Sequence, residues 1–169
     1  LSGATDNGYI MSVYYYNSVR LTCMAAKVLG YTEDEKKYAE RSKKIYDAIL
    51  DEFFAPNGKL AIDTQTGYVL SLYFDIYRNR ERVISDFKER LSKDFYKIKS
   101  GFTGTPLMLP TLFKCKMDNE AYRMLYNEEF PGWLYCVNLG ATTIGERWNS
   151  LNPDGKISGI NMNSLNHYA

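Results

Sequence analysis

One short segment of the chain combines a carboxylate with small hydroxylated residues and an indole ring. Residues 140–150 read Gly-Ala-Thr-Thr-Ile-Gly-Glu-Arg-Trp-Asn-Ser. The carboxylate, Glu146, belongs to the residue types that accept a proton from water in general base catalysis. Glu146 could equally pair with Arg147 or with the start of a helix, where free amide groups attract negative charge. From these residues alone, both interpretations stay open.

The one histidine, His167, lies close in sequence to a serine, Ser164. Nucleophilic catalysis by this pair would need a nucleophile elbow and a third member of a triad, and the sequence contains neither. Spacing alone therefore leaves His167 as an ordinary buried or surface histidine.

Two polar turns precede segments with a helical pattern. Residues 101–106 read Gly-Phe-Thr-Gly-Thr-Pro, a weak phosphate-binding turn because no lysine follows and Pro106 lacks a backbone donor. We expect a tight entry into a helix there, with Thr105 as N-cap and Pro106 at the first helical position. Residues 63–67, Asp-Thr-Gln-Thr-Gly, also predict an N-cap, and their polar side chains could face a sugar-sized ligand.

Apolar residues recur at three- and four-residue steps through most of the chain, which predicts an all-α protein. In the first helix the expected apolar stripe includes Leu21, Met24 and Val28. The predicted helices span residues 9–29, 32–54, 65–77, 80–99, 107–113 and 118–129, and long loops with one or two short helices follow Pro131. The expected boundary signals are Gly30 as a C-terminal stop, Thr32 with Glu35 as a capping box, and Asp118 as an N-cap.

Weakly charged helices alternate with strongly charged ones along the chain. Residues 65–77 and 107–113 leave almost no polar face, whereas residues 80–99 carry a narrow apolar stripe on a charged helix. This alternation is expected of a ring of antiparallel helical hairpins, whose inner helices are covered by outer ones, and not of an up-and-down bundle. No strict repeat supports a solenoid. The loops after Ser100 and Gly140 should meet at one end of the ring.

The composition narrows the classes of partner. The length of 169 residues favours one domain, and 45% hydrophobic residues suffice for an ordinary core. A net charge of +1 gives no electrostatic reason to expect nucleic acid or a membrane surface. No apolar run approaches the ~18 residues of a membrane helix. Three scattered cysteines and one histidine suggest neither disulfides nor zinc, and we expect no metal and no cofactor.

Two further features bear on function. An aromatic content of 15% suggests a cleft or surface lined with rings. The sequence starts without Met and stops without a closing signal, which we interpret as a piece of a longer protein. Nothing in the sequence indicates a compartment.

Three blocks near the end of the chain form a recognisable pattern. They are residues 140–148, Gly-Ala-Thr-Thr-Ile-x-Glu-Arg-Trp, then Asp154-Gly155, and residues 162–169, Met-Asn-Ser-x-Asn-His-Tyr-Ala. Their order and spacing resemble the catalytic-domain signature of bacterial α-L-rhamnosidases, glycoside hydrolase family 78. Further matching blocks are residues 63–68, 101–106 and 129–135, so that the resemblance covers nearly the whole chain.

The resemblance implies an (α/α)6 toroid that removes terminal α-L-rhamnose from oligosaccharides or other glycosides, with inversion at the anomeric carbon. It implies Glu146 as the general base. The matching blocks further imply substrate-binding roles for His167, Trp148, Arg147, Thr105 and Asn166. Such an enzyme also needs a general acid, and the family's Asp-Glu-Arg-x-Gly-Trp type block that carries it does not occur in this sequence.

Residues 1–169 are therefore expected to be a fragment of a single catalytic domain, which lacks its N-terminal part and its last closing helices. The remainder of that domain would be its partner, and the fragment alone would be inactive. Gly145 departs from the family, which usually has Trp there, and the loss of that ring could remove a wall of the pocket. Two alternatives stay open: another hydrolase or lyase on the same toroid, and a helical carbohydrate-binding or interaction module without catalysis.

Overall fold

The computed structural model describes residues 5–159 and 164–167. Within these residues the chain forms helices and irregular segments with no β-strand, which confirms the all-α prediction. No helix in this part of the chain is both long and apolar enough to cross a membrane. The helices are α1 (Asn7–Leu29), α2 (Thr32–Phe53), α3 (Gln65–Tyr73), α4 (Arg80–Lys93), α5 (Thr105–Lys114), α6 (Asp118–Leu125) and α7 (Trp133–Asn138).

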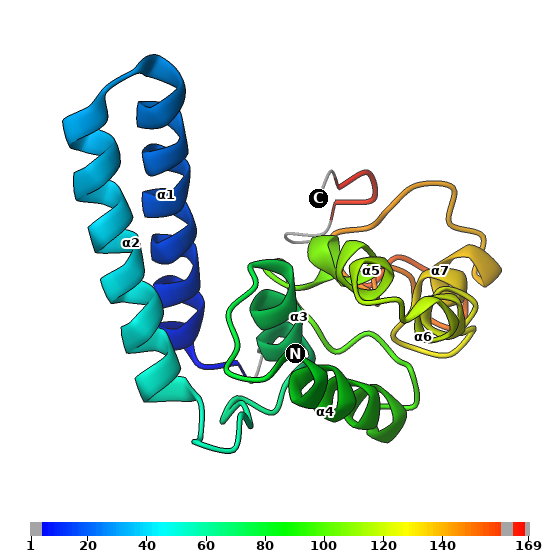
Figure 1. Cartoon of the computed structure of the whole chain (residues 1–169). Helices are drawn as coiled ribbons and strands as arrows, with labels where there is room; N and C mark the ends of the chain where they lie inside the picture. The colour runs from blue at the N-terminus through cyan, green and yellow to red at the C-terminus, as the bar shows by residue number, and fades with distance from the viewer. Residues whose placement is uncertain (1–4, 160–163, 168–169) are drawn as a thin grey trace.

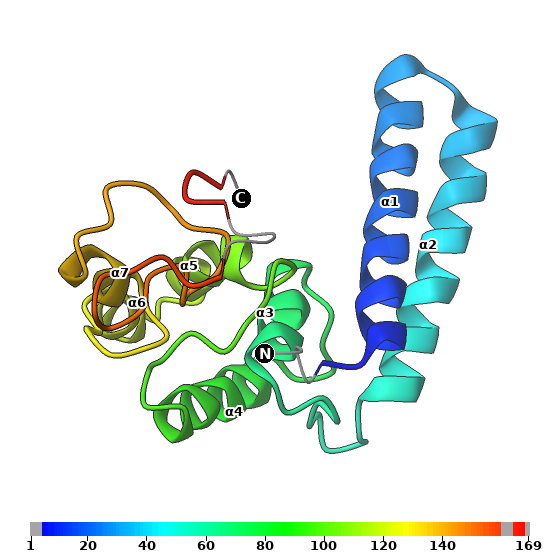
Figure 2. The ribbon, with the colours of Figure 1, turned by 180° about the vertical axis from the view of Figure 1, so that it is seen from behind.

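Consecutive helices pair as hairpins: α1 packs on α2, α3 on α4, and α5 on α6. The first helices of these hairpins also contact one another, α1 with α3 and α3 with α5. An inner row of helices is thus covered by an outer row, as in part of an (α/α)6 toroid. Figures 1 and 2 show that the long α1–α2 hairpin stands away from the other helices, while the ends of α1 and α2 nearest α3 join the common core.

Helix α3 is the most deeply buried element, because nearly all its surface meets other helices. Residues 65–72 are all buried. Its neighbour α4 buries a single stripe, Val83, Phe87 and Leu91, and the ring of Tyr68 stacks on Phe87 at 5.6 Å between centroids. The sequence correctly predicted that this weakly charged helix would be more buried than its charged neighbour.

The predicted apolar stripe of α1 is largely exposed within this chain. The exposed fractions of Leu21, Met24 and Val28 are 51%, 54% and 85%. Only Tyr9, Val13, Val19 and Ala26 of this helix are buried. The predicted helix is confirmed, and the exposure of this stripe agrees with the expectation that an inner helix of an incomplete ring leaves apolar side chains uncovered.

The predicted N-terminal caps at Thr32, Thr105 and Asp118 are wrong by one residue. Each of these residues is the first residue of its helix. The N-cap positions are Tyr31, Gly104 and Met117, none of which makes a side-chain hydrogen bond to its helix. Two other predicted boundaries are confirmed: Gly30 ends α1 in a left-handed conformation, and Thr64 accepts the Gly67 N–H at 3.0 Å as the cap of α3.

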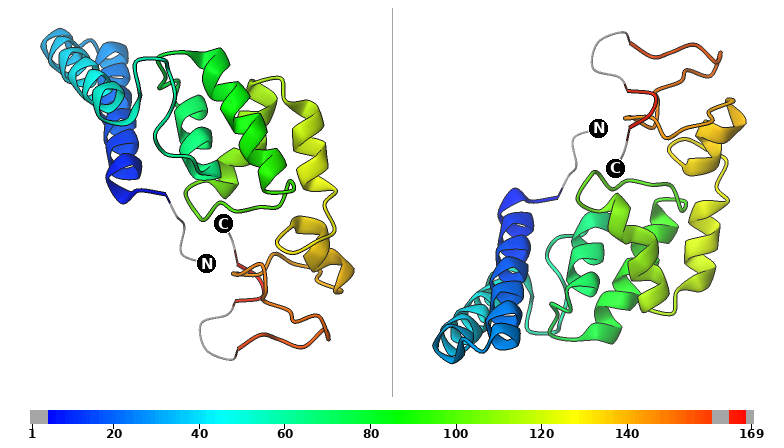
Figure 3. Two further views of the ribbon diagram at one scale, coloured as in Figure 1. Left: turned by 90° about the horizontal axis from the view of Figure 1, so that it is seen from below. Right: turned by 90° about the horizontal axis from the view of Figure 1, so that it is seen from above.

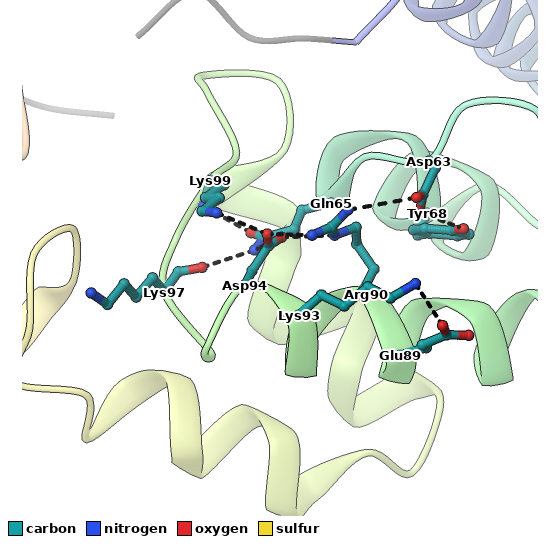
Figure 4. A network of polar contacts seen from close by, with 9 residues as sticks. All are labelled: Asp63, Gln65, Tyr68, Glu89, Arg90, Lys93, Asp94, Lys97 and Lys99. Atoms are coloured by element: carbon teal, nitrogen blue, oxygen red, sulfur yellow. Dashed lines mark hydrogen bonds and ion pairs between the residues drawn. The ribbon is translucent and has the colours of Figure 1, made fainter.

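Helix α4 ends at Lys93 rather than near residue 99 because a buried polar network holds the following loop (Figure 4). The carboxylate of Asp94, a residue only 3% exposed, accepts two hydrogen bonds from Arg90, at 2.7 and 3.1 Å. It also accepts the Gln65 side-chain amide at 2.9 Å. Gln65 is therefore a structural residue inside the fold, and the expectation that it could face a ligand is wrong.

Candidate functional site

Residues 143–147 and 164–167 lie side by side, joined by two hydrogen bonds between backbone groups and one from a side-chain hydroxyl. Neither segment is helical, so the two run as irregular chain next to each other. The bonds join the Glu146 N–H to the Ser164 carbonyl at 2.8 Å, the His167 N–H to the Ile144 carbonyl at 2.8 Å, and the Thr143 hydroxyl to the Leu165 carbonyl. Glu146 and His167, which the sequence singled out separately, therefore sit on adjacent segments.

The Glu146 side chain is half-buried and is oriented by the backbone of the neighbouring segment. Its Oε2 atom accepts the Ser164 N–H at 2.9 Å. No ion pair joins Glu146 to Arg147, and no helix of the described chain begins near Glu146. The two structural interpretations left open by the sequence are thus not found, and the carboxylate is held instead by an amide donor from a distant block.

The turn after Glu146 is closed by a buried serine. The Ser150 hydroxyl accepts the Arg147 N–H at 3.0 Å, and the Ser150 N–H donates to the Arg147 carbonyl at 3.0 Å. Gly145 lies directly against this serine, because a Cβ atom at position 145 would be 2.6 Å from the Ser150 Oγ. The loop that carries Glu146 therefore depends on a close backbone approach at Gly145.

Trp148 ties this loop to helix α7. Its ring meets that of Trp133 edge to face, with 5.9 Å between centroids. The thiol of Cys136, on the same helix, lies 3.4 Å from the Trp148 carbonyl. Burial raises the pKa of the Cys136 thiol above its ordinary value, so this group stays protonated at neutral pH. These contacts indicate that Trp148 holds the loop of Glu146 against helix α7.

The loop before α5 reaches the same site. The ring of Phe102 lies 5.8 Å from the imidazole of His167, with 53° between their planes. Thr105, at the start of α5, donates its hydroxyl to the Ser100 carbonyl at 3.0 Å. The predicted meeting of the loops after Ser100 and Gly140 is thereby confirmed. Figure 3 shows the segment after α7 folding back beside the compact group of α3, α4, α5 and α6.

The remaining predicted residues occupy different surroundings. Arg147 and Asn166 are exposed, and Thr105 and His167 are half-buried. The predicted block at residues 162–169 is described only from 164 to 167. Phe102 belongs to the matching block at residues 101–106, but the sequence pattern assigns it no role. Its exposed position beside His167 becomes apparent only in the fold.

Two other features lie outside this site. A groove of about 910 Å³ runs between α1 and α2 and is lined by residues of those helices, none of which belongs to the predicted site. Among the described residues, no three His, Cys, Asp or Glu side chains gather as a metal-binding group. The polar groups at the site include the oriented Glu146 carboxylate, the His167 imidazole and the Arg147 guanidinium, beside aromatic rings.

A row of helical hairpins with an oriented carboxylate on its loops is the arrangement that the sequence led us to expect of a helical-toroid glycosidase. Residues 1–169 match the family described as the bacterial alpha-L-rhamnosidase 6 hairpin glycosidase domain. The chain belongs to this family.

Known alpha-L-rhamnosidases are similar to the chain over nearly its whole length. The chain is 37% identical to an alpha-L-rhamnosidase of Formosa agariphila and 37% identical to one of an Alteromonas species, each over 99% of the chain. A crystal structure of the Streptomyces avermitilis alpha-L-rhamnosidase, complexed with L-rhamnose, matches the whole chain with a TM-score of 0.91 and 33% identity. The native Aspergillus terreus enzyme matches 92% of it with a TM-score of 0.85 and 33% identity.

The chain spans less than a fifth of the length of these relatives. It covers 18% of the Formosa agariphila protein, 19% of the Alteromonas protein, and 16% and 18% of the two chains of known structure.

Proposed function

We propose that the chain is part of the catalytic (α/α)6 domain of an inverting α-L-rhamnosidase, in which Glu146 is the general base. The observation that carries this proposal is the pairing of residues 143–147 with residues 164–167, which brings Glu146 beside the segment of His167 in a chain of this family. The proposed substrate is a glycoside or oligosaccharide that ends in α-L-rhamnose, as the L-rhamnose complex of the Streptomyces avermitilis relative suggests.

The rest of the active site would come from a longer protein that contains this chain, here called the parent protein. Support comes from the 16–19% of each relative that the chain covers, and from the apolar face that α1 leaves exposed. The parent protein would supply the general acid, the remaining hairpins of the toroid and the other half of the sugar pocket.

In the proposed mechanism Glu146 accepts a proton from a water molecule as that water attacks the anomeric carbon. The general acid of the parent protein protonates the glycosidic oxygen on the opposite face, so that the old C–O bond breaks as the new one forms. The product is then the β-anomer of rhamnose. Inverting hydrolases hold their two carboxyl groups about 6.5–9.5 Å apart to leave room for this water. The Ser164 N–H, 2.9 Å from Oε2, would keep the Glu146 carboxylate aimed at it.

The other site residues are proposed to bind the sugar in two ways. His167, Arg147 and Asn166 are polar residues at or near the surface of the paired segments, and they would donate hydrogen bonds to the sugar hydroxyls. Trp148 and Thr105 are engaged with Trp133 and Ser100, so they would shape the sugar subsite by holding its loops.

The test of the general base is Glu146→Gln in the parent protein. Glutamine keeps the size of the side chain and can still accept the Ser164 N–H, but it cannot take a proton from water. We expect turnover of nitrophenyl α-L-rhamnoside to fall by roughly 10²–10⁴-fold, with little change in KM, because the loss lies in the transition state.

The matched control is Glu128→Gln, an exposed glutamate on the loop before α7, which should leave turnover unchanged. Near-normal turnover of Glu146→Gln would remove Glu146 from the mechanism. If the unchanged parent protein binds L-rhamnose but hydrolyses no rhamnoside, a carbohydrate-binding module on the same fold becomes the better description.

A further inference from the structure

An exposed phenyl ring stands at the edge of the proposed sugar site. Phe102 is 69% exposed, although the transfer of a phenyl group out of water is favourable. Its ring contacts the half-buried imidazole of His167 at 5.8 Å between centroids. The walls of ligand-binding sites are mainly apolar and aromatic, with a few polar groups for orientation, and the pairing of Phe102 with His167 supplies one of each kind.

The backbone that carries Phe102 is held in one conformation by local hydrogen bonds. The Gly101 carbonyl accepts the N–H of Gly104 at 3.0 Å and that of Thr105 at 2.9 Å, which closes a tight turn around Phe102. A Cβ atom at position 104 would be 2.6 Å from the Thr66 Oγ1, so the turn rests directly on α3. The ring is therefore presented by a fixed turn against a buried helix.

The segment that leads into this turn is anchored as well. The Lys99 N–H donates to the Gln65 Oε1 at 2.9 Å, and the Lys99 ammonium lies 3.0 Å from the buried Asp94 carboxylate (Figure 4). Both sides of the turn are thus tied to the core, one through this network and the other through α5. A loop whose backbone is already fixed before a ligand arrives loses little conformational entropy on binding.

We infer that Phe102 is a substrate-binding residue whose ring forms the apolar wall of the sugar subsite and contacts the methyl group of L-rhamnose. The inference rests on the proposed function. Rhamnose is a deoxy sugar, with a methyl group where mannose has a hydroxymethyl group, so it has one apolar corner among its hydroxyls. Phe102 has no polar atom and suits that corner, while His167 beside it suits a hydroxyl.

The experiment compares two substrates that differ only in the methyl group, in the parent protein and in Phe102→Ala. Nitrophenyl α-L-lyxopyranoside is nitrophenyl α-L-rhamnopyranoside without that methyl. Phe102→Ala should lower kcat/KM for the rhamnoside by roughly 10–100-fold, since one apolar group in a pocket is worth 10–200-fold in discrimination. It should change kcat/KM for the lyxoside by less than about 2-fold, because the contact is already absent from that substrate.

Two further variants separate a local contact from a general disturbance. Phe102→Tyr keeps the ring and should stay within a few-fold of the unchanged parent protein on the rhamnoside. Phe95→Ala removes a phenyl group that is 74% exposed on the same connection between α4 and α5, and it should leave both substrates unaffected. Equal losses on rhamnoside and lyxoside, or no loss on the rhamnoside, would overturn the inference.

Binding measurements distinguish failure of this inference from failure of the proposed function. If the parent protein hydrolyses neither substrate, calorimetric titration with L-rhamnose and L-lyxose still tests the contact. Phe102→Ala should then weaken rhamnose binding by about 10-fold or more and leave lyxose binding unchanged. Equal affinities of the parent protein and Phe102→Ala for L-rhamnose would reject the contact whatever the fate of Glu146.

Discussion

The backbone at Gly145 packs closely against the side chain of Ser150. A side chain at this position would place its Cβ 2.6 Å from the Oγ and 2.7 Å from the Cβ of Ser150, closer than such atoms approach in proteins. Ser150 is itself buried and accepts the Arg147 N–H. The tryptophan that the family resemblance led us to expect at this position therefore cannot enter the present loop conformation unless Ser150 moves, and the local structure accounts for glycine here.

The prediction at this position is that Gly145→Ala in the parent protein lowers kcat/KM, because the loop shifts and Glu146 moves with it. A displacement of about 1 Å at a catalytic group can cost 10²-fold. Gly145→Ala combined with Ser150→Gly should recover much of the loss, since the second change removes the colliding side chain. The measurement is a double-mutant cycle on kcat/KM. Strictly additive effects of the two substitutions would exclude the proposed collision.

At the scale of single residues, the sequence predicted Glu146 and His167 through the resemblance of their blocks. Local patterns could not show what holds Glu146, because its partner is the backbone amide of Ser164, which carries no side-chain signal. The same limit applies to Phe102. Its place beside His167 depends on how the turn rests on Thr66, a contact between segments far apart in the chain.

At the scale of elements, the existence of the helices followed from apolar periodicity, whereas their ends depended on local turns and on contacts with other segments. Helix α3 stops at Tyr73 although the apolar pattern continues to residue 77, because Asp75 adopts a left-handed conformation. The Ile76 N–H then donates to the Ser71 carbonyl at 2.8 Å, and the Ser71 hydroxyl donates to the Ile76 carbonyl at 2.6 Å. Helix α4 stops where Asp94 and the following loop bind α3 through Gln65. The first interaction is a local turn that apolar periodicity does not register, and the second joins residues 29 positions apart, so both displace the predicted ends.

The prediction at this scale concerns Gln65→Leu. Leucine fills a similar volume but leaves the Lys97 carbonyl, the Lys99 N–H and one bond of the Asp94 carboxylate without their partner. Each unsatisfied buried group costs about 1–3 kcal/mol, so we expect the free energy of unfolding to fall by roughly 2–4 kcal/mol in urea titrations. Asn119→Leu, which replaces an exposed amide on α6, should change it by less than about 0.5 kcal/mol. Equal stability of the two variants would contradict the role of Gln65 in holding the loop after α4 against α3.

At the scale of the whole molecule, the exposed face of α1 belongs to the inner row of helices. The inner helices contact one another in the order α1, α3, α5, so α1 is the end of the row within this chain. Met11, Leu21, Met24 and Val28 are all more than half exposed there. Because the chain belongs to a six-hairpin family and its described residues form three hairpins, we propose that further inner helices of the parent protein cover this face. The sequence predicted the apolar stripe, and the family resemblance led us to expect its partner in the remainder of the domain.

The last prediction tests that arrangement with Met24→Lys and Val28→Lys combined. In the chain alone both side chains are already in water, so the double variant should unfold at nearly the same urea concentration and should bind less of a hydrophobic dye. In the parent protein the same change would bury two unpaired charges, and each costs several kcal/mol unless it is paired. The parent variant should therefore melt at a clearly lower temperature or fail to accumulate as folded protein.

Lys36→Glu, on the exposed surface of α2, provides a charge-changing control that should leave both proteins unaffected. A double variant that destabilises the chain alone as much as the parent protein would show that this face of α1 has its partner within residues 1–169.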